Sequence, residues 1–552
     1  MHLEKTHINP SRRVLELLSL ERRDVYIVFF LTLGAGLLAF AIPLAVQALV
    51  NVVTMGGVVQ PLVVVSLILF ILLCLSGTLY LLEYYVVELI QRRVFVRESL
   101  HSVRDAQAMS VSISDSHNPI ELMNRFFDVT TVQKTSYQLL TKGLAAALQA
   151  IVGSLVLMFY SFYFALVSLF LLLMAWVIVV VLGRMAVPSA IHESYAKYNL
   201  ASWLEGIANN LNIFKFSGGQ NLAISQANDL ASDYLVRRRK HFGTLFKQNL
   251  VAVIVYAVAG SLMLGLGGWL VMEGRINLGQ FVAAELIIFG VLGAFLNFVS
   301  KLEYFYEMVA AMDKLATIHD MPKERLDGHV VTLESAPELT CMDITFSYSN
   351  HHHVLNNVAF SVKPNTSVVI LAETGVDRAI LADILVGLRN PTSGVVQING
   401  LDLRLLDLGE FRKKVAFANH LEILEGSILD NLRFGNSSNL SEIKAVLESL
   451  GLSKRIQELP DGLDTLLVPK GLPLTRIEQR LLMIARAILD KPYLVVIDAI
   501  LDEVDIHALA IISKALQPTV QPWTLIVLTQ SQTVAECFAN SVRLGIPQGE
   551  RT

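Results

Sequence analysis

Few residues in this chain combine a reactive side chain with a spacing that suggests chemistry. Glu285 is a lone carboxylate inside an apolar stretch, Phe281 to Ser300. It could line a translocation path or simply reach water at the nearby end of the stretch. Three histidines, 351 to 353, could bind a metal, but no second group of ligands accompanies them, so a solvated turn is the preferred interpretation. The three cysteines are too far apart for a CxxC metal site.

The composition of the whole chain limits the kinds of element that could position such groups. The 552 residues include 44 Lys and Arg against 48 Asp and Glu, and only 17% are charged while 53% are hydrophobic. Soluble domains carry about 25% charged residues. The composition therefore excludes a disordered chain and an ordinary soluble enzyme. The small net charge gives no reason to expect nucleic-acid binding.

Most of the apolar residues precede residue 310. From Val25 to Leu82 there is no charged residue, and a polar, glycine-containing stretch at 51–61 divides this run into two segments. Each segment reaches the roughly 20 residues that a membrane helix needs. Further spans are predicted by three more runs: Gly143 to Gly183 (two spans that turn near Ser161), Gln248 to Met272, and Phe281 to Ser300.

Basic residues predict the orientation of these six spans. They are concentrated before the first span and in the two long segments that follow spans two and four, including the cluster Arg237 to Lys240. The opposite hairpins carry only Arg275. The positive-inside rule therefore predicts cytoplasmic termini and two long cytoplasmic loops. The first apolar stretch is too long for a cleavable signal. Aromatic residues at 159–163 fit an interfacial belt.

A change in composition follows the last span. Residues 321–336 (MPKERLDGHVVTLESA) are polar, contain Pro and Gly, and predict a linker between domains at 1–320 and 337–552. Beyond it, short apolar runs alternate with helical stretches, which predicts a soluble α/β domain with a mostly parallel sheet. We expect strands at Ser367–Leu371, Leu381–Leu388, Leu494–Ile497 and Leu525–Leu528.

This organisation and a series of motifs in a fixed order resemble an ABC exporter half-transporter over nearly the whole chain. Tyr348 resembles the aromatic residue that stacks on adenine, and 368–394 lies where the phosphate loop and its helix belong. Residues 474–505 occupy the place of the signature helix, the Walker B strand and the D-loop, and 528–533 that of the H-switch. The resemblance implies a membrane all-α six-helix transmembrane domain followed by a soluble α/β P-loop NTPase-like ABC domain.

The phosphate loop of this family reads G-x-x-G-x-G-K-[ST], and no such loop occurs in the chain. The glycines let backbone N–H groups approach the phosphates, the Lys binds the β- and γ-phosphates, and the hydroxyl binds Mg²⁺. The matching positions run from Ala372 to Ala379 and keep only Gly375. Asp377 brings a negative charge towards the phosphates, and Arg378 replaces a compact ammonium by a planar fork. Ala379 cannot bind Mg²⁺.

The other motifs of the ATP site differ as well. Asn419 stands in place of the Q-loop glutamine, and Gln530 in place of the H-switch histidine. Walker B keeps Asp498, but Ala499 replaces the neighbouring general base. The degenerate signature comprises Leu474, Thr475, Arg476, Ile477 and Glu478. In it, two side chains fill the positions where glycines would let the partner's backbone approach the γ-phosphate.

The resemblance predicts a dimeric exporter-type transport component of the bacterial inner membrane whose ABC domain is a pseudo-ATPase with no catalytic residues. We expect ATP and Mg²⁺ to bind weakly or not at all, and no metal site. The dimer, with two copies or with another half-transporter, would have twelve spans, and type I secretion exporters of this style work with a periplasmic adaptor protein. Two alternatives stay open: a non-catalytic partner of an ATP-competent half-transporter, and an active exporter with an atypical ATP site.

Overall fold

The computed structural model of the chain forms two compact units. It describes all residues except 1–9, 55–58, 116–117, 217, 326, 349–352, 373, 420, 436–437, 518–521 and 545–552. A helical unit comprises residues up to 322 apart from 110–115, and a mixed unit comprises 110–115 and the residues from 323 onward. The division along the chain thus falls after Pro322, within the stretch predicted as a linker. Two of the three consecutive histidines lie outside the described residues.

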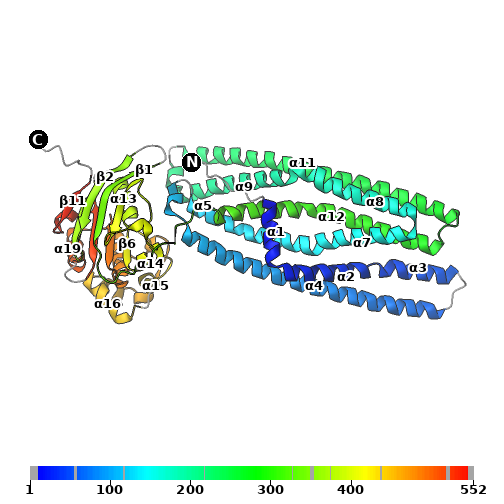
Figure 1. Cartoon of the computed structure of the whole chain (residues 1–552), viewed down its shortest axis with the longest axis horizontal. Coiled ribbons are helices and arrows are strands. Elements are labelled where there is room, and N and C mark those ends of the chain that lie inside the picture. The colour runs from blue at the N-terminus through cyan, green and yellow to red at the C-terminus, as the bar shows by residue number, and fades with distance from the viewer. Residues whose placement is uncertain are drawn as a thin grey trace. The chain divides into compact units, whose positions relative to one another are not determined.

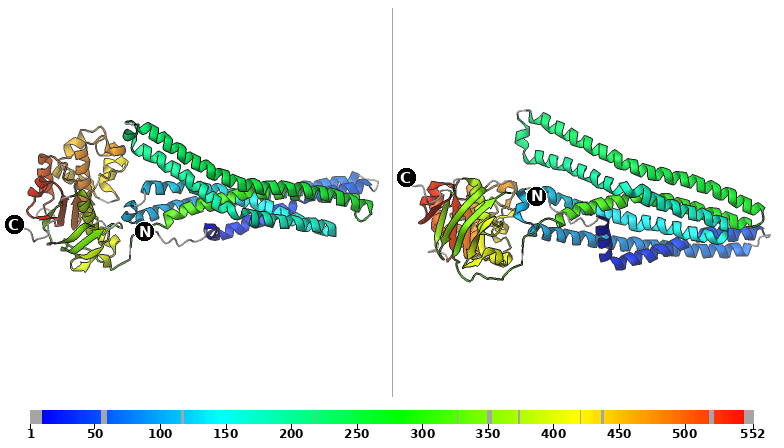
Figure 2. Two further views of the ribbon diagram at one scale, coloured as in Figure 1. Left: turned by 90° about the horizontal axis from the view of Figure 1, so that it is seen from above. Right: turned by 45° about the horizontal axis from the view of Figure 1, so that its top comes forward.

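The helical unit contains six long apolar segments, which confirms the six predicted spans (Figure 1). Its helices are α1 (Pro10–Leu20), α2 (Arg22–Leu38), α3 (Ala41–Thr54), α4 (Val59–Ala108), α5 (Pro119–Asn124), α6 (Asp128–Tyr137), α7 (Leu144–Tyr160), α8 (Phe162–Trp176), α9 (Ala186–Asn209), α10 (Leu211–Phe214), α11 (Gly219–Met272) and α12 (Leu278–His319). Both views of Figure 2 show the long helices running lengthwise beside one another.

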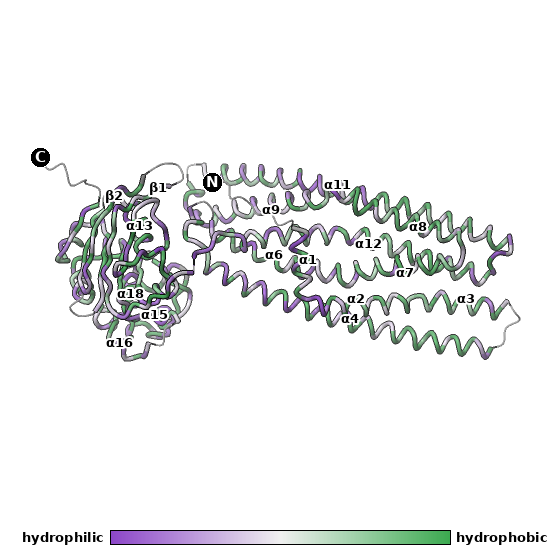
Figure 3. The backbone as a smooth tube through the Cα atoms, in the orientation of Figure 1, coloured by the Kyte–Doolittle hydropathy of each residue, from purple (hydrophilic) through white to green (hydrophobic). Residues whose placement is uncertain are grey.

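These helices are much longer than a membrane is thick. At 1.5 Å per residue, the 54 residues of α11 extend about 80 Å, whereas the hydrocarbon layer is about 30 Å thick. Figure 3 shows hydrophobic residues concentrated in the parts of α8, α11 and α12 that lead to the hairpins, and polar residues where α6 and α9 lie. The polar ends therefore extend the spans beyond the hydrocarbon layer, as the long loops predicted.

Small residues let the helices of this unit approach closely. A Cβ added to Gly153 of α7 would lie 2.3 Å from Cγ2 of Val291 in α12, and one added to Gly267 of α11 would lie 2.4 Å from the Phe281 ring. Such close backbone contacts replace hydrophobic collapse as a source of helix association in lipid. α12 starts with a capping box in which Asn277 and Gln280 satisfy each other's backbone N–H groups.

The mixed unit contains a parallel sheet in the order β11-β3-β10-β9-β6 and an antiparallel sheet in the order β2-β1-β4-β5. The strands are β1 (Leu339–Ser347), β2 (His353–Val362), β3 (Ser367–Leu371), β4 (Ser393–Ile398), β5 (Leu401–Asp402), β6 (Val415–Ala418), β7 (Gly426–Ser427), β8 (Leu466–Leu467), β9 (Leu494–Asp498), β10 (Thr524–Thr529) and β11 (Ser541–Arg543). The helices are α13 (Gly375–Leu385), α14 (Leu408–Arg412), α15 (Ile428–Arg433), α16 (Leu440–Ser449), α17 (Ser453–Gln457), α18 (Arg476–Leu489), α19 (Ile506–Ala515) and α20 (Gln532–Glu536). The predicted α/β domain is confirmed.

The strand expected at Leu381–Leu388 is wrong, because these residues form the second half of α13 and the turn after it. Leu381, Ala382, Ile384 and Leu385 are all buried in the core of the unit. A helix buried on several sides has a nearly continuous apolar run, and such a run cannot be told from a buried strand by periodicity.

Candidate functional site

Three loops of the mixed unit meet at one edge of the parallel sheet. β10 lies between β3 and β9, and in this register Thr529 pairs with Leu371 while Leu528 pairs with Asp498. Because parallel strands end at the same edge, the residues that follow β3, β9 and β10 lie close together. The structure therefore brings together the segments predicted from the phosphate loop, the Walker B strand and the H-switch.

Arg378 is bound by two carboxylates of the neighbouring loop. Its Nε atom lies 2.5 Å from Oδ1 of Asp498, and its Nη1 atom donates to Oδ2 of Asp502 at 3.1 Å. The Arg378 side chain is 11% exposed and that of Asp498 only 2%. The Arg378 cation, predicted to stand at the position of the phosphate-loop lysine, is thus paired with carboxylates of its own chain.

Asp502 lies at the centre of the candidate site, although the sequence did not single it out. Besides Arg378, it accepts hydrogen bonds from the Thr529 hydroxyl and, at 3.2 Å, from the backbone N–H of Gln530. It joins all three loops, because Arg378 follows β3 and Thr529 ends β10. The available signal was an additional carboxylate four residues after Asp498, within a segment already assigned to the site.

Ala499 shapes the turn that aims Asp502 at Arg378. Its φ of +57° is in the left-handed region, which L side chains rarely adopt. The N–H of Ala499 donates to the Leu528 carbonyl at 3.0 Å, and its own carbonyl accepts from the N–H of Asp502 at 3.1 Å. The methyl group of Ala499 offers no proton acceptor at the position predicted for the general base.

The N-terminus of α13 meets groups of its own chain. Thr374 caps the helix, and its hydroxyl accepts a hydrogen bond from the N–H of Asp377 at 3.2 Å. The Asp377 carboxylate lies in the first turn, where the helix dipole stabilises a negative charge. A phosphate that approached the same helix end would meet this carboxylate, and their like charges would repel.

The remaining positions of the phosphate loop are filled closely. Ala372 is 4% exposed, and its N–H donates to the Thr529 carbonyl at 3.0 Å. A Cβ added to Gly375 would lie 3.7 Å from Oε1 of Gln530, so the Gln530 side chain faces the start of α13. Ala379 is half-buried in the first turns of α13 and presents only a methyl group.

Tyr348 and Asn419 follow other strands and do not belong to the three loops. Tyr348 comes directly after β1, is half-buried, and packs edge-to-face on Phe346 with ring centroids 5.3 Å apart. Asn419 comes directly after β6 and is half-buried as well. Tyr348 thus packs against the apolar core of this unit as a partly buried side chain.

The residues at the place of the signature form a regular helix start. Thr475 caps α18 in a capping box: its N–H donates to Oε2 of Glu478 at 2.8 Å, and its hydroxyl accepts from the Glu478 N–H at 3.3 Å. Glu478 is also paired with Arg455 at 3.1 Å. Leu474, the residue before the cap, is buried. Arg476 is exposed, whereas Ile477 packs against the core. Side chains here stabilise the helix and occupy the surface that glycines would leave open.

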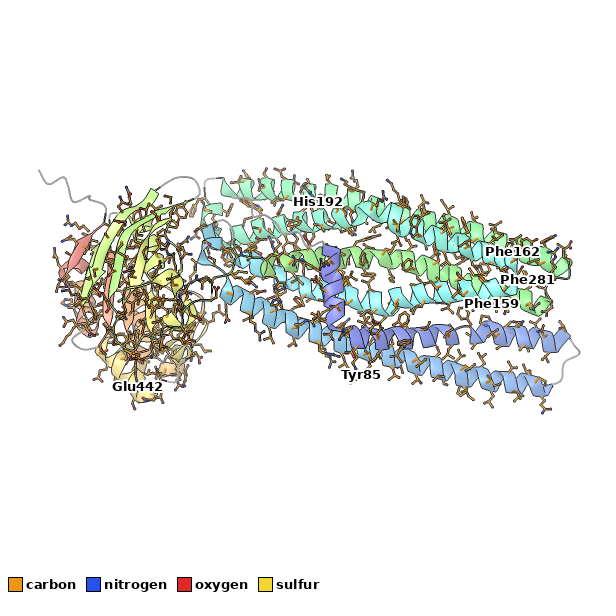
Figure 4. All side chains as sticks on the ribbon, viewed as in Figure 1. Tyr85, Phe159, Phe162, His192, Phe281 and Glu442 are labelled. Atoms are coloured by element: carbon orange, nitrogen blue, oxygen red, sulfur yellow. The ribbon has the colours of Figure 1, made fainter. Side chains whose placement is uncertain are left out.

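Glu285 lies on α12, about two turns after the cap at Asn277, and is half-buried. Neither of its carboxylate oxygens has a hydrogen-bond partner among the residues that the structure describes. Figure 4 shows Phe159, Phe162 and Phe281 at the same end of the helical unit. Phe159 is 91% exposed and Phe162 72%, as an interfacial aromatic belt would require.

Both units match known families of protein domain. The family model described as "ABC transporter transmembrane region" matches residues 25–295, and the model described as "ABC transporter" matches residues 355–502. A solved structure of a bacterial Atm1-family ABC exporter with ATP bound is similar over 95% of this chain and 94% of its own, with a TM-score of 0.83 and 17% identity. At this identity the likeness shows the fold alone.

Three curated relatives illustrate the range of similarity. An export ATP-binding/permease protein of Rickettsia bellii is 25% identical over 64% of this chain, and the match spans only 63% of the relative. The ABC transporter ATP-binding protein YwjA of Bacillus subtilis is 21% identical over 91% of this chain and 88% of its own. The lactococcin-A transport/processing ATP-binding protein LcnC of Lactococcus lactis is 25% identical over 52% of this chain, and the match spans 41% of LcnC.

Proposed function

We propose that this chain is a transport component that does not hydrolyse ATP. The premise is that it is an exporter-like ABC transporter protein with six membrane spans and a C-terminal ABC domain. We further propose that it acts as a dimer of two copies in the bacterial inner membrane, with both termini in the cytoplasm. The ion pairs of Arg378 with Asp498 and Asp502 carry the first proposal.

Binding of Mg²⁺ and ATP at this edge of the sheet would have to separate Arg378 from its two carboxylates. Leaving a buried charge without its partner costs about 3–5 kcal/mol. Since each 1.4 kcal/mol is a factor of ten, any of these charges that the nucleotide and metal leave unpaired would weaken binding by roughly 10²–10⁴-fold. Repulsion between Asp377 and the phosphates would add to this cost.

Hydrolysis would need an activated water as well as bound nucleotide. A positioned general base contributes about 10²–10⁴-fold to such a rate, and the methyl group of Ala499 cannot supply it. The amide of Gln530, which faces the start of α13, does not titrate in the physiological range. Even bound ATP would therefore turn over slowly at this site.

The helix start at Thr475 bears on the choice of partner. In an ABC dimer, each composite site takes a phosphate loop from one chain and a signature from the other. Arg476 is exposed where the signature would have a glycine, and Ile477 replaces the other glycine, so pairing with an ATP-competent half-transporter would leave both composite sites incomplete. This supports the pairing of two copies over the heterodimer, and the periplasmic adaptor stays a prediction from the resemblance.

The direct experiment is Mg²⁺-dependent ATP turnover and binding by the full chain reconstituted in lipid. We expect phosphate release no higher than that of the Asp498→Asn variant, and no saturable binding at micromolar ATP. A variant that restores the loop with Ala372→Gly, Asp377→Gly, Arg378→Lys and Ala379→Ser should bind ATP more tightly than the natural chain. Turnover by the natural chain that is abolished in Arg378→Ala would refute the proposal and favour an active exporter with an atypical site.

A further inference from the structure

The helical unit contains a second cluster of chemically versatile side chains, far along the chain from the ATP-site motifs. Glu98 and His101 belong to α4, and His319 is the last residue of α12. One potential ligand atom from each of the three lies within 4.8 Å of the other two. Glu98 and His101 are three positions apart, so they share a face of α4, and Asp105 continues that face one turn later.

The cluster lies well beyond the apolar part of α4. The uncharged run of the sequence ends at Leu82, and His101 follows 19 residues later, or about 28 Å along the helix axis. The cluster is therefore in the polar extension of the helix, where a metal ion in water can reach it.

The four side chains contact one another directly. Nε2 of His319 lies 3.3 Å from Oε2 of Glu98, and Nδ1 of His319 is hydrogen-bonded to Oδ2 of Asp105. The ring of His101 stacks on that of His319 with centroids 4.1 Å apart and an interplanar angle of 18°. The side chains of Glu98, Asp105 and His319 are 11%, 5% and 17% exposed.

We propose that Glu98, His101 and His319 form a binding site for a divalent transition-metal ion of the zinc class, with Asp105 as the residue that orients His319. Imidazole and carboxylate ligands suit Zn²⁺ and its neighbours, whereas Ca²⁺ and Mg²⁺ prefer sites made of oxygen atoms. A histidine ligand almost always donates its other ring N–H to a carboxylate or carbonyl, and Asp105 accepts that hydrogen bond here.

The charge of the cluster matches a divalent cation. The carboxylates of Glu98 and Asp105 supply two negative charges, which the ion would neutralise. Arg97 is paired with Glu21 at 2.9 Å, and its Nε atom also lies 3.7 Å from Oε1 of Glu98, so a bound metal would share Glu98 with this arginine. Arg13 is paired with Asp320 at 2.6 Å.

The geometry needs the rotation of one ring to hold the ion. Zinc bonds of 2.0–2.1 Å in a tetrahedral site place ligand atoms about 3.3 Å apart, and Nε2 of His319 and Oε2 of Glu98 already have this separation. The His101 ring is stacked on that of His319 and must turn so that its ring plane contains the ion. A cavity of about 970 Å³ opens beside the three ligands. Apart from these ligands, its charged lining residues are Glu16, Glu21 and five arginines, Arg13, Arg92, Arg93, Arg97 and Arg104. Water in this cavity could supply the fourth ligand. The bound metal would tie the end of α4 to the end of α12.

The test is metal binding by the full chain in detergent or nanodiscs after treatment with a chelator. We expect one Zn²⁺ per chain in competition with a chromogenic chelator, and Co²⁺ should give the intense visible bands of a tetrahedral site. His319→Asn and His101→Asn should each abolish both signals. His101 is half exposed at 51%, so its replacement is the variant least disruptive to folding.

Two further variants distinguish a built site from adventitious binding. Asp105→Asn should weaken Zn²⁺ binding by about 10–100-fold while keeping one ion per chain, as expected for a residue that orients a ligand. His192→Asn removes an exposed histidine of α9 and should change nothing (Figure 4). If the natural chain binds no more Zn²⁺ than the His101→Asn variant, the cluster is only an ion-pair network and the proposal is wrong.

Discussion

Replacement of Arg378 by methionine tests whether the ATP-site edge is closed by its own ion pairs. The substitution keeps an unbranched apolar stem and removes the guanidinium with its charge, so Asp498 and Asp502 lose their cation. Because the Asp498 side chain is only 2% exposed, the loss should be that of a broken buried pair, about 3–5 kcal/mol. An exposed pair would contribute only about 0–1 kcal/mol.

The assay follows thermal unfolding of the mixed unit in the full chain. Trp523 is buried there at 1% exposure, and the other tryptophans, at 176, 203 and 269, belong to the helical unit and can be replaced by phenylalanine. For a domain of this size, each kcal/mol shifts the melting temperature by about 2–4 °C. Arg378→Met should therefore lower the melting temperature by about 6–20 °C.

Two controls complete this experiment. Arg476→Met removes an exposed arginine of the same unit and should change the stability by no more than about 0.5 kcal/mol. Adding Asp498→Asn to Arg378→Met removes the buried charge and should recover a large part of the loss. If Arg378→Met shifts the melting temperature by no more than Arg476→Met does, Arg378 is not held by the carboxylates and remains available to a phosphate.

Three further predictions follow from local contacts. Thr475→Ala removes the capping box of α18 and should cost about 0.5–2 kcal/mol, measured with the same Trp523 signal; an unchanged melting temperature would contradict the capping role. Gly153→Ala places a methyl group 2.3 Å from Val291 and should destabilise the helical unit by about 1–3 kcal/mol, whereas Gly268→Ala, which meets nothing within 4 Å, should not. The side chain of Arg404 hydrogen-bonds Asp402 and lowers its pKa, so this carboxylate stabilises the fold above its ordinary pKa of about 3.9 and the stabilisation is lost as the pH falls. Asp402→Asn should therefore make urea unfolding less dependent on pH below about pH 4, and an unaltered pH profile would show that the pair contributes nothing.

The spans and the main strands could be predicted because their signals are local. Charge-free runs such as Val25–Leu82 exceed the thickness of a membrane, and β3 has the predicted bounds because its apolar residues end at a polar loop. The motif order also named segments that the structure places at one edge of the sheet, although the sequence itself did not predict that they would meet there. Leu381–Leu388 could not be assigned correctly, because burial on several sides removes the periodicity that separates a helix from a strand.

The contacts that decide function depend on tertiary structure. The pairing of Arg378 with Asp502 requires the left-handed turn at Ala499, and nothing in the sequence marks an alanine for that conformation. His319 meets Glu98 because the end of α12 packs beside the turn of α4 that contains Glu98. The apolar pattern of the two helices does not specify which turn of α4 this is. The Arg378 ion pairs and the Glu98–His101–His319 cluster therefore could be identified only from the positions of the side chains.

The most direct measurement of the central claim is ATP turnover by the natural chain in lipid, with the Asp498→Asn variant as the background. Our account predicts equal phosphate release from the two proteins and no Mg²⁺-dependent binding at micromolar ATP. Phosphate release that exceeds the Asp498→Asn background and saturates with ATP would show that Arg378 yields its carboxylates to the nucleotide, which contradicts the account.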